Sequence, residues 1–261
     1  MNEPSSHDRP LLCAVDSRGI ATLVFNRPEK RNSYNQAMIK ALFEEMVRLG
    51  TDPSVRALVL RGAGQHFSAG ADVSERHDPA DMEGMRMLAL CTGLDSMPKP
   101  LIALVQGACI GGAVALISCC DMVIATQTAF FSLPEVRLGF APGPLIPFFL
   151  RGMSARNLRR YLLSGERFTA VEALRIGLVH ELCDTDAGDA ALAKLIDEVL
   201  LAGPNAAVQA KELLHRLTDV PITKELLAEL QFEFNQRLEA PEAVEGRAAF
   251  REKRKPKWHP I

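Results

Sequence analysis

The fold of this chain is decided by residues 101–149, which read LIALVQGACIGGAVALISCCDMVIATQTAFFSLPEVRLGFAPGPLIPFF. Residues 101–105 form a short β-rich run that ends in a Gln-Gly turn, which predicts a strand leading into a glycine corner. Residues 113–120 carry no charge, so we expect a buried helix that begins at Gly112. The first N–H groups of a helix lack partners within it, so such a start can receive an anion or a developing oxyanion. For an isolated glycine pair, close packing of the helix on the strand is an equally good interpretation.

A second corner of small residues follows another predicted strand. Residues 56–61 (RALVLR) have the pattern of a buried strand, and residues 62–72 (GAGQHFSAGAD) come directly after it. If the two corners face each other, the backbone N–H groups of Ala71 and Gly112 can both donate to one carbonyl oxygen. The sequence therefore predicts an oxyanion hole that is made from backbone alone.

Four segments in the right order resemble the enoyl-CoA hydratase/isomerase (crotonase) superfamily. They are FNRPEKRN at residues 25–32, FSAGAD at 67–72, the stretch 107–121 and FSLPEVRLG at 131–139. The resemblance implies an α/β fold, a crotonase-like spiral of repeated ββα units with a C-terminal helical trimerisation region. We expect residues 1–200 to form the spiral core and residues 201–261 the helical region. The resemblance also implies a homotrimer or a hexamer built as a dimer of trimers.

The same resemblance implies a ligand and a set of site residues. The ligand is a coenzyme A thioester, whose carbonyl becomes an enolate oxyanion held by Ala71 and Gly112. Glu135 matches a catalytic glutamate of the family. The residues implied in binding the acyl-CoA are Arg31, Ala69, Gly70, Asp72, Val73, Ile110 and Gly111, with Phe250 and Lys253 reaching the coenzyme A of a neighbouring subunit. Coenzyme A enters as part of the substrate, so no separate cofactor and no metal are expected.

The chain departs from the family pattern at residue 115. The resemblance implies that the familiar hydratases of this family use two glutamates for proton transfer. Ala115 occupies the position that matches the first of them. Alanine cannot move a proton, so Glu135 is left as the one acid/base group. The nearest resemblance is to 3-methylglutaconyl-CoA and isohexenylglutaconyl-CoA hydratases and to the hydroxymethylglutaryl dehydratases of polyketide assembly. It implies addition of water to, or its removal from, a branched or glutaconyl-type enoyl-CoA thioester.

Two other functions stay open at this point. A Δ3-Δ2 enoyl-CoA isomerase shuttles one proton across an allyl system and needs no base for water. A non-catalytic acyl-CoA-binding protein would keep the fold without turnover, since a fold does not fix a function. A retained Glu135 beside an intact hole argues against the second of these. Without the resemblance, the preferred interpretation of Glu135 after Pro134 is an ordinary glutamate in the first turn of a helix, where the dipole favours it.

The composition excludes several classes of protein. A net charge of −2 gives no reason to expect nucleic acid or an acidic membrane surface as a partner. The 6 cysteines lie mostly inside apolar runs without metal-site spacing, which predicts free thiols in a reducing cytoplasm. No uninterrupted apolar run reaches about 18 residues, so we expect no membrane contact. The sequence motifs of serine hydrolases, P-loop proteins, zinc peptidases and dinucleotide-binding proteins are absent.

Periodicity and capping signals predict the remaining elements. Strands are expected at 11–15, 20–25, 57–60, 123–125, 129–131 and 178–180. Helices are expected at 79–94, 145–150, 187–201, 204–217, 223–238 and 241–250. Asn35 is expected to cap a further helix with an apolar face of Met38, Ile39, Leu42, Phe43, Met46, Val47 and Leu49, and TAVE at 169–172 has the pattern of a capping box. His66 and His77 are expected to have polar surface roles.

Overall fold

The computed structural model describes residues 9–74 and 83–260, and for residues 83–86 it describes the backbone alone. Its centre is a 6-stranded sheet with the strand order β1-β2-β3-β4-β6-β9. Neighbouring strands in this sheet run parallel except for the β1–β2 hairpin. The strands are β1 (Leu11–Val15), β2 (Ile20–Phe25), β3 (Ala57–Gly62), β4 (Leu101–Val105), β6 (Met122–Thr126) and β9 (Glu181–Cys183).

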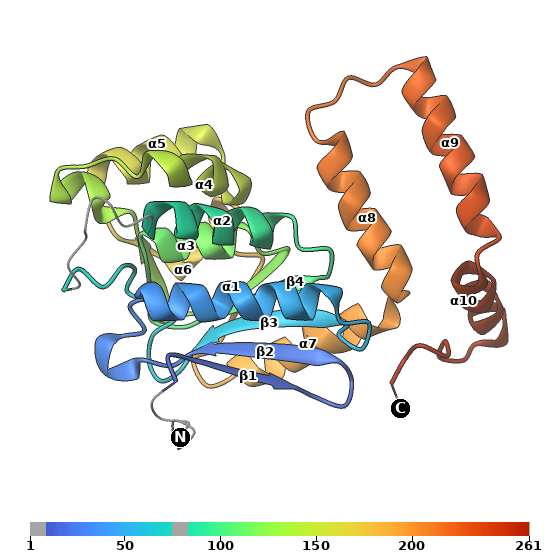
Figure 1. Ribbon diagram of the computed structural model, residues 1–261, viewed down its shortest axis with the longest axis horizontal. Helices are drawn as coiled ribbons and strands as arrows, with labels where there is room; N and C mark the ends of the chain where they lie inside the picture. The colour runs from blue at the N-terminus through green and yellow to red at the C-terminus, as the bar shows by residue number, and fades with distance from the viewer. Residues whose placement is uncertain (1–8, 75–82, 261) are drawn as a thin grey trace.

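Helices cover both faces of this sheet (Figure 1), which is why its central strands are mostly apolar and β4 is apolar along its whole length. On one face lie α1 (Gln36–Thr51), α2 (Glu83–Asp95) and α3 (Gly112–Ser118). On the other face lies α7 (Gly188–Leu201), whose Leu192, Ile196 and Leu200 pack on Val59, Ile102 and Ile124. Burying each such Leu or Ile side chain stabilises the fold by roughly 1.5–3 kcal/mol.

The predicted helix that follows Asn35 is confirmed, but its buried face is narrower than expected. The Asn35 side chain accepts a hydrogen bond from the Met38 N–H at 3.0 Å and so caps α1. Phe43 and Val47, predicted to be part of the apolar face, are 38% and 52% exposed. At 100° per residue Phe43 lies about 40° beyond the buried arc and Val47 about 80° beyond it, so both side chains turn towards solvent.

A small second sheet connects the central sheet to the candidate site. It has the order β5-β7-β8, with β5 (Ala108–Ile110), β7 (Phe130–Ser132) and β8 (Phe168–Thr169). The sequence did not predict β5, because its three residues stand between two glycine turns and are too few to show a period. The parallel pairing of β5 with β7 sets Ile110 opposite Ser132.

Short helical segments follow the second sheet. They are the 3-10 helices η3 (Pro134–Leu138) and η4 (Gly143–Leu145), then α4 (Ile146–Gly152), α5 (Ala155–Ser164) and α6 (Ala170–Arg175). A further 3-10 helix, η2 (Pro28–Lys30), lies before α1. Helix α5 packs against η3, and the Tyr161 ring of α5 lies 4.1 Å from the Phe168 ring between centroids. Helix α5 therefore packs against both η3 and the strand β8 of the second sheet.

Two expectations for residues 169–183 need correction. Thr169 does cap α6 by accepting from the Glu172 N–H at 3.3 Å, but the Glu172 carboxylate binds Arg175 and Tyr161, so the box is half formed. The strand predicted at 178–180 is wrong, because the strand is β9 at Glu181–Cys183. Residues 178 and 179 are buried, and their N–H groups donate to the Ala173 carbonyl, so their apolar character reflects the end of a helix.

The last three helices leave the body of the molecule (Figure 1). They are α8 (Pro204–Leu217), α9 (Lys224–Leu238) and α10 (Pro241–Glu252), as predicted to within two residues. Helix α9 has no buried residue, and only Lys211 of α8 and Ala249 of α10 are buried. None of the described helices is long and apolar enough to cross a membrane.

Polar contacts fasten this helical arm to the body at both ends. At the start, the Lys211 ammonium group lies 2.7 Å from an Asp121 carboxylate oxygen and 3.1 Å from the Lys99 carbonyl oxygen. The same Asp121 oxygen accepts from the Leu101 N–H at 2.8 Å. At the end, the Trp258 indole N–H donates to the Leu201 carbonyl oxygen at 3.1 Å.

We expect Lys211→Met to lower the free energy of unfolding by about 2 kcal/mol, because the half-buried Asp121 carboxylate and the buried Lys99 carbonyl oxygen both lose the Lys211 ammonium group. Arg216→Met is the matched control, since Arg216 pairs with Glu233 on the exposed arm and such pairs contribute less than about 1 kcal/mol. Urea unfolding of both variants measures the difference. Equal losses would contradict the role of Lys211 as an anchor.

Candidate functional site

The two predicted corners face each other. Ser68 of the first corner forms a parallel bridge with Cys109 of the second. The Ser68 N–H donates to the Ala108 carbonyl oxygen at 2.9 Å, and the Ile110 N–H donates to the Ser68 carbonyl oxygen at 3.1 Å. Gly70 has φ +89°, and a Cβ built on it would lie 2.8 Å from the Ile110 carbonyl oxygen. Only glycine permits this approach of the two backbones.

A third segment holds the first corner in place. Tyr34 forms a parallel bridge with Ala71, in which the Tyr34 N–H donates to the Gly70 carbonyl oxygen and the Asp72 N–H donates to the Tyr34 carbonyl oxygen, both at 2.9 Å. In such a bridge the N–H of the central residue points away from the partner strand. The Ala71 N–H is therefore directed away from Tyr34.

The second corner ends where α3 begins. Gly111 has φ +59°, and its N–H donates to the Ser132 carbonyl oxygen at 2.9 Å. Every residue of α3 is buried, as predicted. Among residues 9–74 and 83–260, no acceptor is present for the N–H groups of Ala71 and Gly112. Both sequence-predicted donors are thus available for a ligand.

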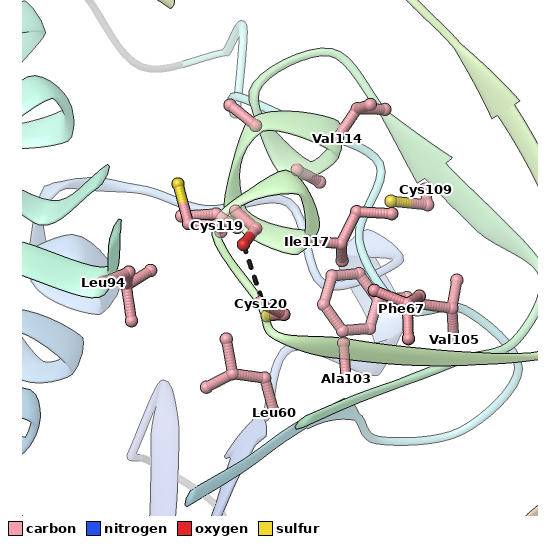
Figure 2. Packing of buried hydrophobic residues seen from close by; sticks show 14 of the residues in the cluster. Leu60, Phe67, Leu94, Ala103, Val105, Cys109, Val114, Ile117, Cys119 and Cys120 are labelled. Carbon is pink, nitrogen blue, oxygen red and sulfur yellow. Dashed lines mark hydrogen bonds between the residues drawn. The ribbon is translucent and has the colours of Figure 1, made fainter. Parts of the chain in front are cut away.

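A buried floor lies beneath α3. Figure 2 shows Ile117 on the side of α3 that faces Phe67, Ala103 and Val105, whereas Val114 lies on the side away from the sheet; all of them belong to one buried cluster. Phe67, from the first corner, belongs to this cluster and is fully buried. Because interiors are close-packed, such a floor resists small displacements of either corner. The thiol of Cys109 is also buried here, which raises its pKa, and the cysteines are free as expected.

The predicted catalytic residue, Glu135, reaches this corner from η3. Pro134 occupies the first turn of η3, and the pairing of β5 with β7 delivers the segment to Gly111. A Cβ built on Gly111 would lie 2.8 Å from Glu135 Oε1. The side chain is buried, and its Oε2 has no hydrogen-bond partner in the described part of the chain. Burial raises the pKa of Glu135, which suits a group that both takes and gives a proton.

Ala115 lies in the same helix, one turn after Gly112, and is fully buried. The resemblance matches residue 115 to the first glutamate of the two-glutamate hydratases, and in this protein that position is buried and apolar. Its methyl group can exclude water or leave room for a substrate branch, but it cannot transfer a proton.

Three of the residues predicted to bind the acyl-CoA, Arg31, Ala69 and Val73, lie in or beside the first corner. Ala69 lies beside Arg31, because its N–H donates to the Arg31 carbonyl oxygen at 2.9 Å. The Arg31 side chain is exposed and forms no ion pair with a described residue. Val73 is 78% exposed at the rim of the first corner. Their part in binding an acyl-CoA stays a prediction.

The Asp72 carboxylate is engaged by neighbouring side chains of the protein itself. Its carboxylate accepts from the Ser74 hydroxyl at 2.6 Å and from the Arg27 guanidinium at 2.8 Å. These hydrogen bonds, with that of Ser74 first, lower the pKa of Asp72 to about 2. The carboxylate is therefore charged and engaged, and it ties the first corner to the loop before η2.

Phe250 and Lys253 are not brought to the site within one chain. Both lie at the end of α10, and Phe250 is 86% exposed. Figure 1 shows α10 at the opposite side of the molecule from α5, against which η3 packs. Their predicted contact with coenzyme A requires a neighbouring subunit.

Sequence reasoning missed two residues that fix the corners. Asn32 is fully buried and donates to the Ala63 and His66 carbonyl oxygens at 2.8 and 2.6 Å. Its only signal was its place in the FNRPEKRN segment. His66 was expected at the surface, but its Nδ1 accepts from the Ala108 N–H at 3.1 Å and joins the two corners. His77 lies outside the described residues.

The match to a family of known proteins covers nearly the whole chain. Residues 16–260 match the family described as enoyl-CoA hydratase/isomerase, so the chain belongs to this family. It is an enzyme of the enoyl-CoA hydratase type. In the described residues no cluster of His, Cys, Asp or Glu could hold a metal ion.

Individual relatives show the extent of the likeness. A mevalonyl-coenzyme A hydratase of Aspergillus fumigatus is 32% identical over 248 residues, which cover 92% of each chain. The 2,3-dehydroadipyl-CoA hydratase of Escherichia coli is 32% identical over 240 residues, 91% of this chain and 94% of the relative. The crystal structure of an enoyl-CoA hydratase from Shewanella pealeana has a TM-score of 0.87 at 34% identity, covering 95% of this chain and 96% of that one. The predicted crotonase-like fold is confirmed, while the nearer likeness to 3-methylglutaconyl-CoA hydratases stays a prediction.

We expect Glu135→Gln to raise the free energy of unfolding at pH 7. The pKa of Glu135 is raised above its usual value of 4.5, so its charged form is disfavoured in the folded state. The stability gained by Gln should shrink as the pH falls through the folded-state pKa and vanish below about 4, where both states of the wild type are protonated. Thermal unfolding at several pH values measures it.

Glu172→Gln is the matched control, with the opposite sign. Hydrogen bonds from Arg175 and then Tyr161 lower the pKa of Glu172 to about 2. Its charged form is therefore favoured by folding, and the same substitution should lower stability at pH 7. If Glu135→Gln also lowers stability at pH 7, its carboxylate has stabilising partners and the assignment of a desolvated acid/base group is wrong.

Proposed function

We propose that this protein adds water to, or removes it from, an α,β-unsaturated acyl-CoA thioester, with Glu135 as the one acid/base group. The proposal is supported by three polar groups on and beside the two facing corners. They are two backbone N–H groups without an acceptor in the described part of the chain, and a buried carboxylate with an unpartnered oxygen. A thioester carbonyl bound by the N–H groups of Ala71 and Gly112 would present its acyl chain near Glu135.

The chemistry follows from this arrangement. Hydration adds hydroxide to the β-carbon and a proton to the α-carbon, and the thioester oxygen carries the negative charge in between. Each backbone donor to that oxygen is worth on the order of 10²- to 10³-fold in rate, because it is fixed before the charge develops. Glu135 takes the proton from water and returns it to the α-carbon, so the carboxylate is regenerated. No separate cofactor is needed for this cycle.

The acyl group is proposed to be branched or carboxylated. Ala115 matches the position of the first glutamate in hydratases that use two. Compared with a glutamate, the alanine leaves space for a substrate and carries no negative charge. A carboxylate buried there beside a substrate carboxylate would be opposed by desolvation and by like-charge repulsion. Two relatives support this choice by name, since a mevalonyl group is branched and a dehydroadipyl group ends in a carboxylate.

A Δ3-Δ2 enoyl-CoA isomerase is the second candidate. The lone Glu135 favours it, because moving one proton across an allyl system needs only one base and no activated water. A panel of linear, branched and carboxylated thioesters separates the two reactions. Hydration removes the conjugated enoyl absorbance, whereas isomerisation of a 3-enoyl thioester creates it. A protein that binds these thioesters and changes none of them would be a non-catalytic binder.

Ala115→Glu tests the substrate assignment. We expect the wild type to hydrate branched or carboxylated enoyl-CoA with a higher kcat/KM than crotonyl-CoA. The added carboxylate should reduce that preferred reaction, and it should raise crotonyl-CoA hydration by supplying a second acid/base group. Ala115→Gln is the control, because it fills the same space without a charge or a transferable proton. An unchanged preference in Ala115→Glu would show that residue 115 does not select the substrate.

We propose that the arm assembles the protein into a trimer or a hexamer. The exposed apolar side chains of α9 support this proposal, with Leu227, Phe232 and Phe234 each more than half exposed. Apolar surface of this kind is typical of an interface. In the assembly, Phe250 and Lys253 would reach the coenzyme A of a neighbour.

We expect sedimentation to give three or six copies of the chain for the wild type. Phe232→Asp should shift the protein towards the monomer, because a charge would be buried at the interface. Leu163→Asp is the control, since Leu163 is equally exposed but lies on α5. A wild type that sediments as a monomer would exclude the assembly.

Lys253→Ala should weaken acyl-CoA binding, and the loss should be largest at low salt, where the charge of the lysine is least screened.

A further inference from the structure

Tyr34 contacts both halves of the proposed oxyanion hole. Its backbone belongs to the first half, through the bridge to Ala71 and the two 2.9 Å hydrogen bonds that flank it. Its side chain belongs to the second half. A Cβ built on Gly112 would lie 2.1 Å from the Tyr34 hydroxyl oxygen and 3.1 Å from the ring carbon that bears it. One residue therefore contacts both of the segments that carry the two N–H groups.

The space beside Gly112 is filled by this hydroxyl. Gly112 is not among the residues with positive φ, so its backbone conformation does not demand glycine. What excludes a side chain at this position is contact with Tyr34 and, at 3.2 Å, with the Met87 methyl group. The glycine and the tyrosine are thus a matched pair, in which a larger residue at either position would displace the other.

The Tyr34 ring cannot move aside easily. It lines a cavity of only about 10 Å³ together with Met38, Ser68, Met87 and Leu116. A cavity of that size holds at most about one water-sized probe, so the ring of this half-buried residue has no empty space on its inner side. A push on the hydroxyl would therefore act on the bridge with Ala71 unless the ring turned outward.

We infer that Tyr34 is a positioning residue, which sets the separation between the Ala71 and Gly112 N–H groups. The inference rests on the proposed oxyanion hole and adds a residue to it. In this role the Tyr34 hydroxyl acts as a spacer against the start of α3, while the backbone of the same residue holds the other donor. Loss of the spacer lets the two corners relax, and both donors then no longer point at one oxygen.

Tyr34→Phe and Gly112→Ala form a double-mutant cycle that tests the spacer. In the wild-type background Gly112→Ala should lower kcat by about 10²-fold, because a displacement near 1 Å at a catalytic donor has about that effect. In the Tyr34→Phe background the closest atoms would be the ring carbon and the Met87 methyl, at 3.1 and 3.2 Å. The same substitution should then cost at least about tenfold less, since contacting residues are not additive.

Tyr161→Phe is the matched control, because it removes the only other tyrosine hydroxyl of the chain. That hydroxyl donates to Glu172, and no contact with Gly112 is present. Combined with Gly112→Ala, it should give no relief of the loss in kcat. Thermal unfolding of the same set checks that each variant is folded.

The carbonyl stretching frequency of a bound saturated acyl-CoA gives a readout that a purely structural role would not move. Two hydrogen bonds polarise the carbonyl and lower its frequency relative to free acyl-CoA. Tyr34→Phe should move the frequency part of the way back, whereas Tyr161→Phe should leave it at the wild-type value. A smaller kcat with little change in KM should accompany that shift.

The outcomes separate this inference from the function on which it rests. If the wild type neither shifts the carbonyl frequency nor acts on any enoyl-CoA, the oxyanion hole itself is wrong. If the wild type does both, but Gly112→Ala costs the same in both backgrounds and Tyr34→Phe leaves the frequency unchanged, Tyr34 does not set the separation. A reduced cost together with a partial return of the frequency supports the inference.

Discussion

Two backbone corners approach each other so closely that a side chain between them would force them apart. Ser68 bridges to Cys109, and Gly70 lies against the Ile110 carbonyl oxygen at a distance that a side chain would prevent. The proposed donors are main-chain groups, so their directions are set by strand pairing and by the buried floor under α3. Such preorganisation is what makes a hydrogen bond to a developing charge effective, because nothing has to reorient during the reaction.

The buried Glu135 carboxylate beside the second corner destabilises the folded state locally. Glu135 is buried with one oxygen unpartnered in the described part of the chain, and its charged form is disfavoured there. The firm supports around it offset that cost: the β5–β7 pairing, the packing of α5 on η3, and the hydrogen bonds of Asn32 and Asp72. A destabilised carboxylate held by a rigid frame is typical of a site selected for chemistry.

Much of the fold could be predicted from the sequence, because long apolar runs and caps are local signals. The strands β1, β2 and β4 and the cap at Asn35 agree with the prediction to the residue. Strand β5 and the position of β9 could not be predicted, since three-residue strands show no period and buried residues at a helix end resemble them. Ala71, Gly112 and Glu135 were predicted from a resemblance, and the structure places the first two on the two facing corners and Glu135 beside the second. The spanning contact of Tyr34 with Gly112 had no signal, because it joins residues distant in the chain.

The central claim is that Glu135 alone transfers the protons while the backbone corner holds the thioester. Single-turnover kinetics of Glu135→Gln, together with the Kd of a saturated acyl-CoA, test it most directly. We expect turnover of the best enoyl-CoA to fall by at least about 10²-fold, as for a lost general acid/base, while Kd changes by less than about threefold. Near-native turnover in this variant would contradict it.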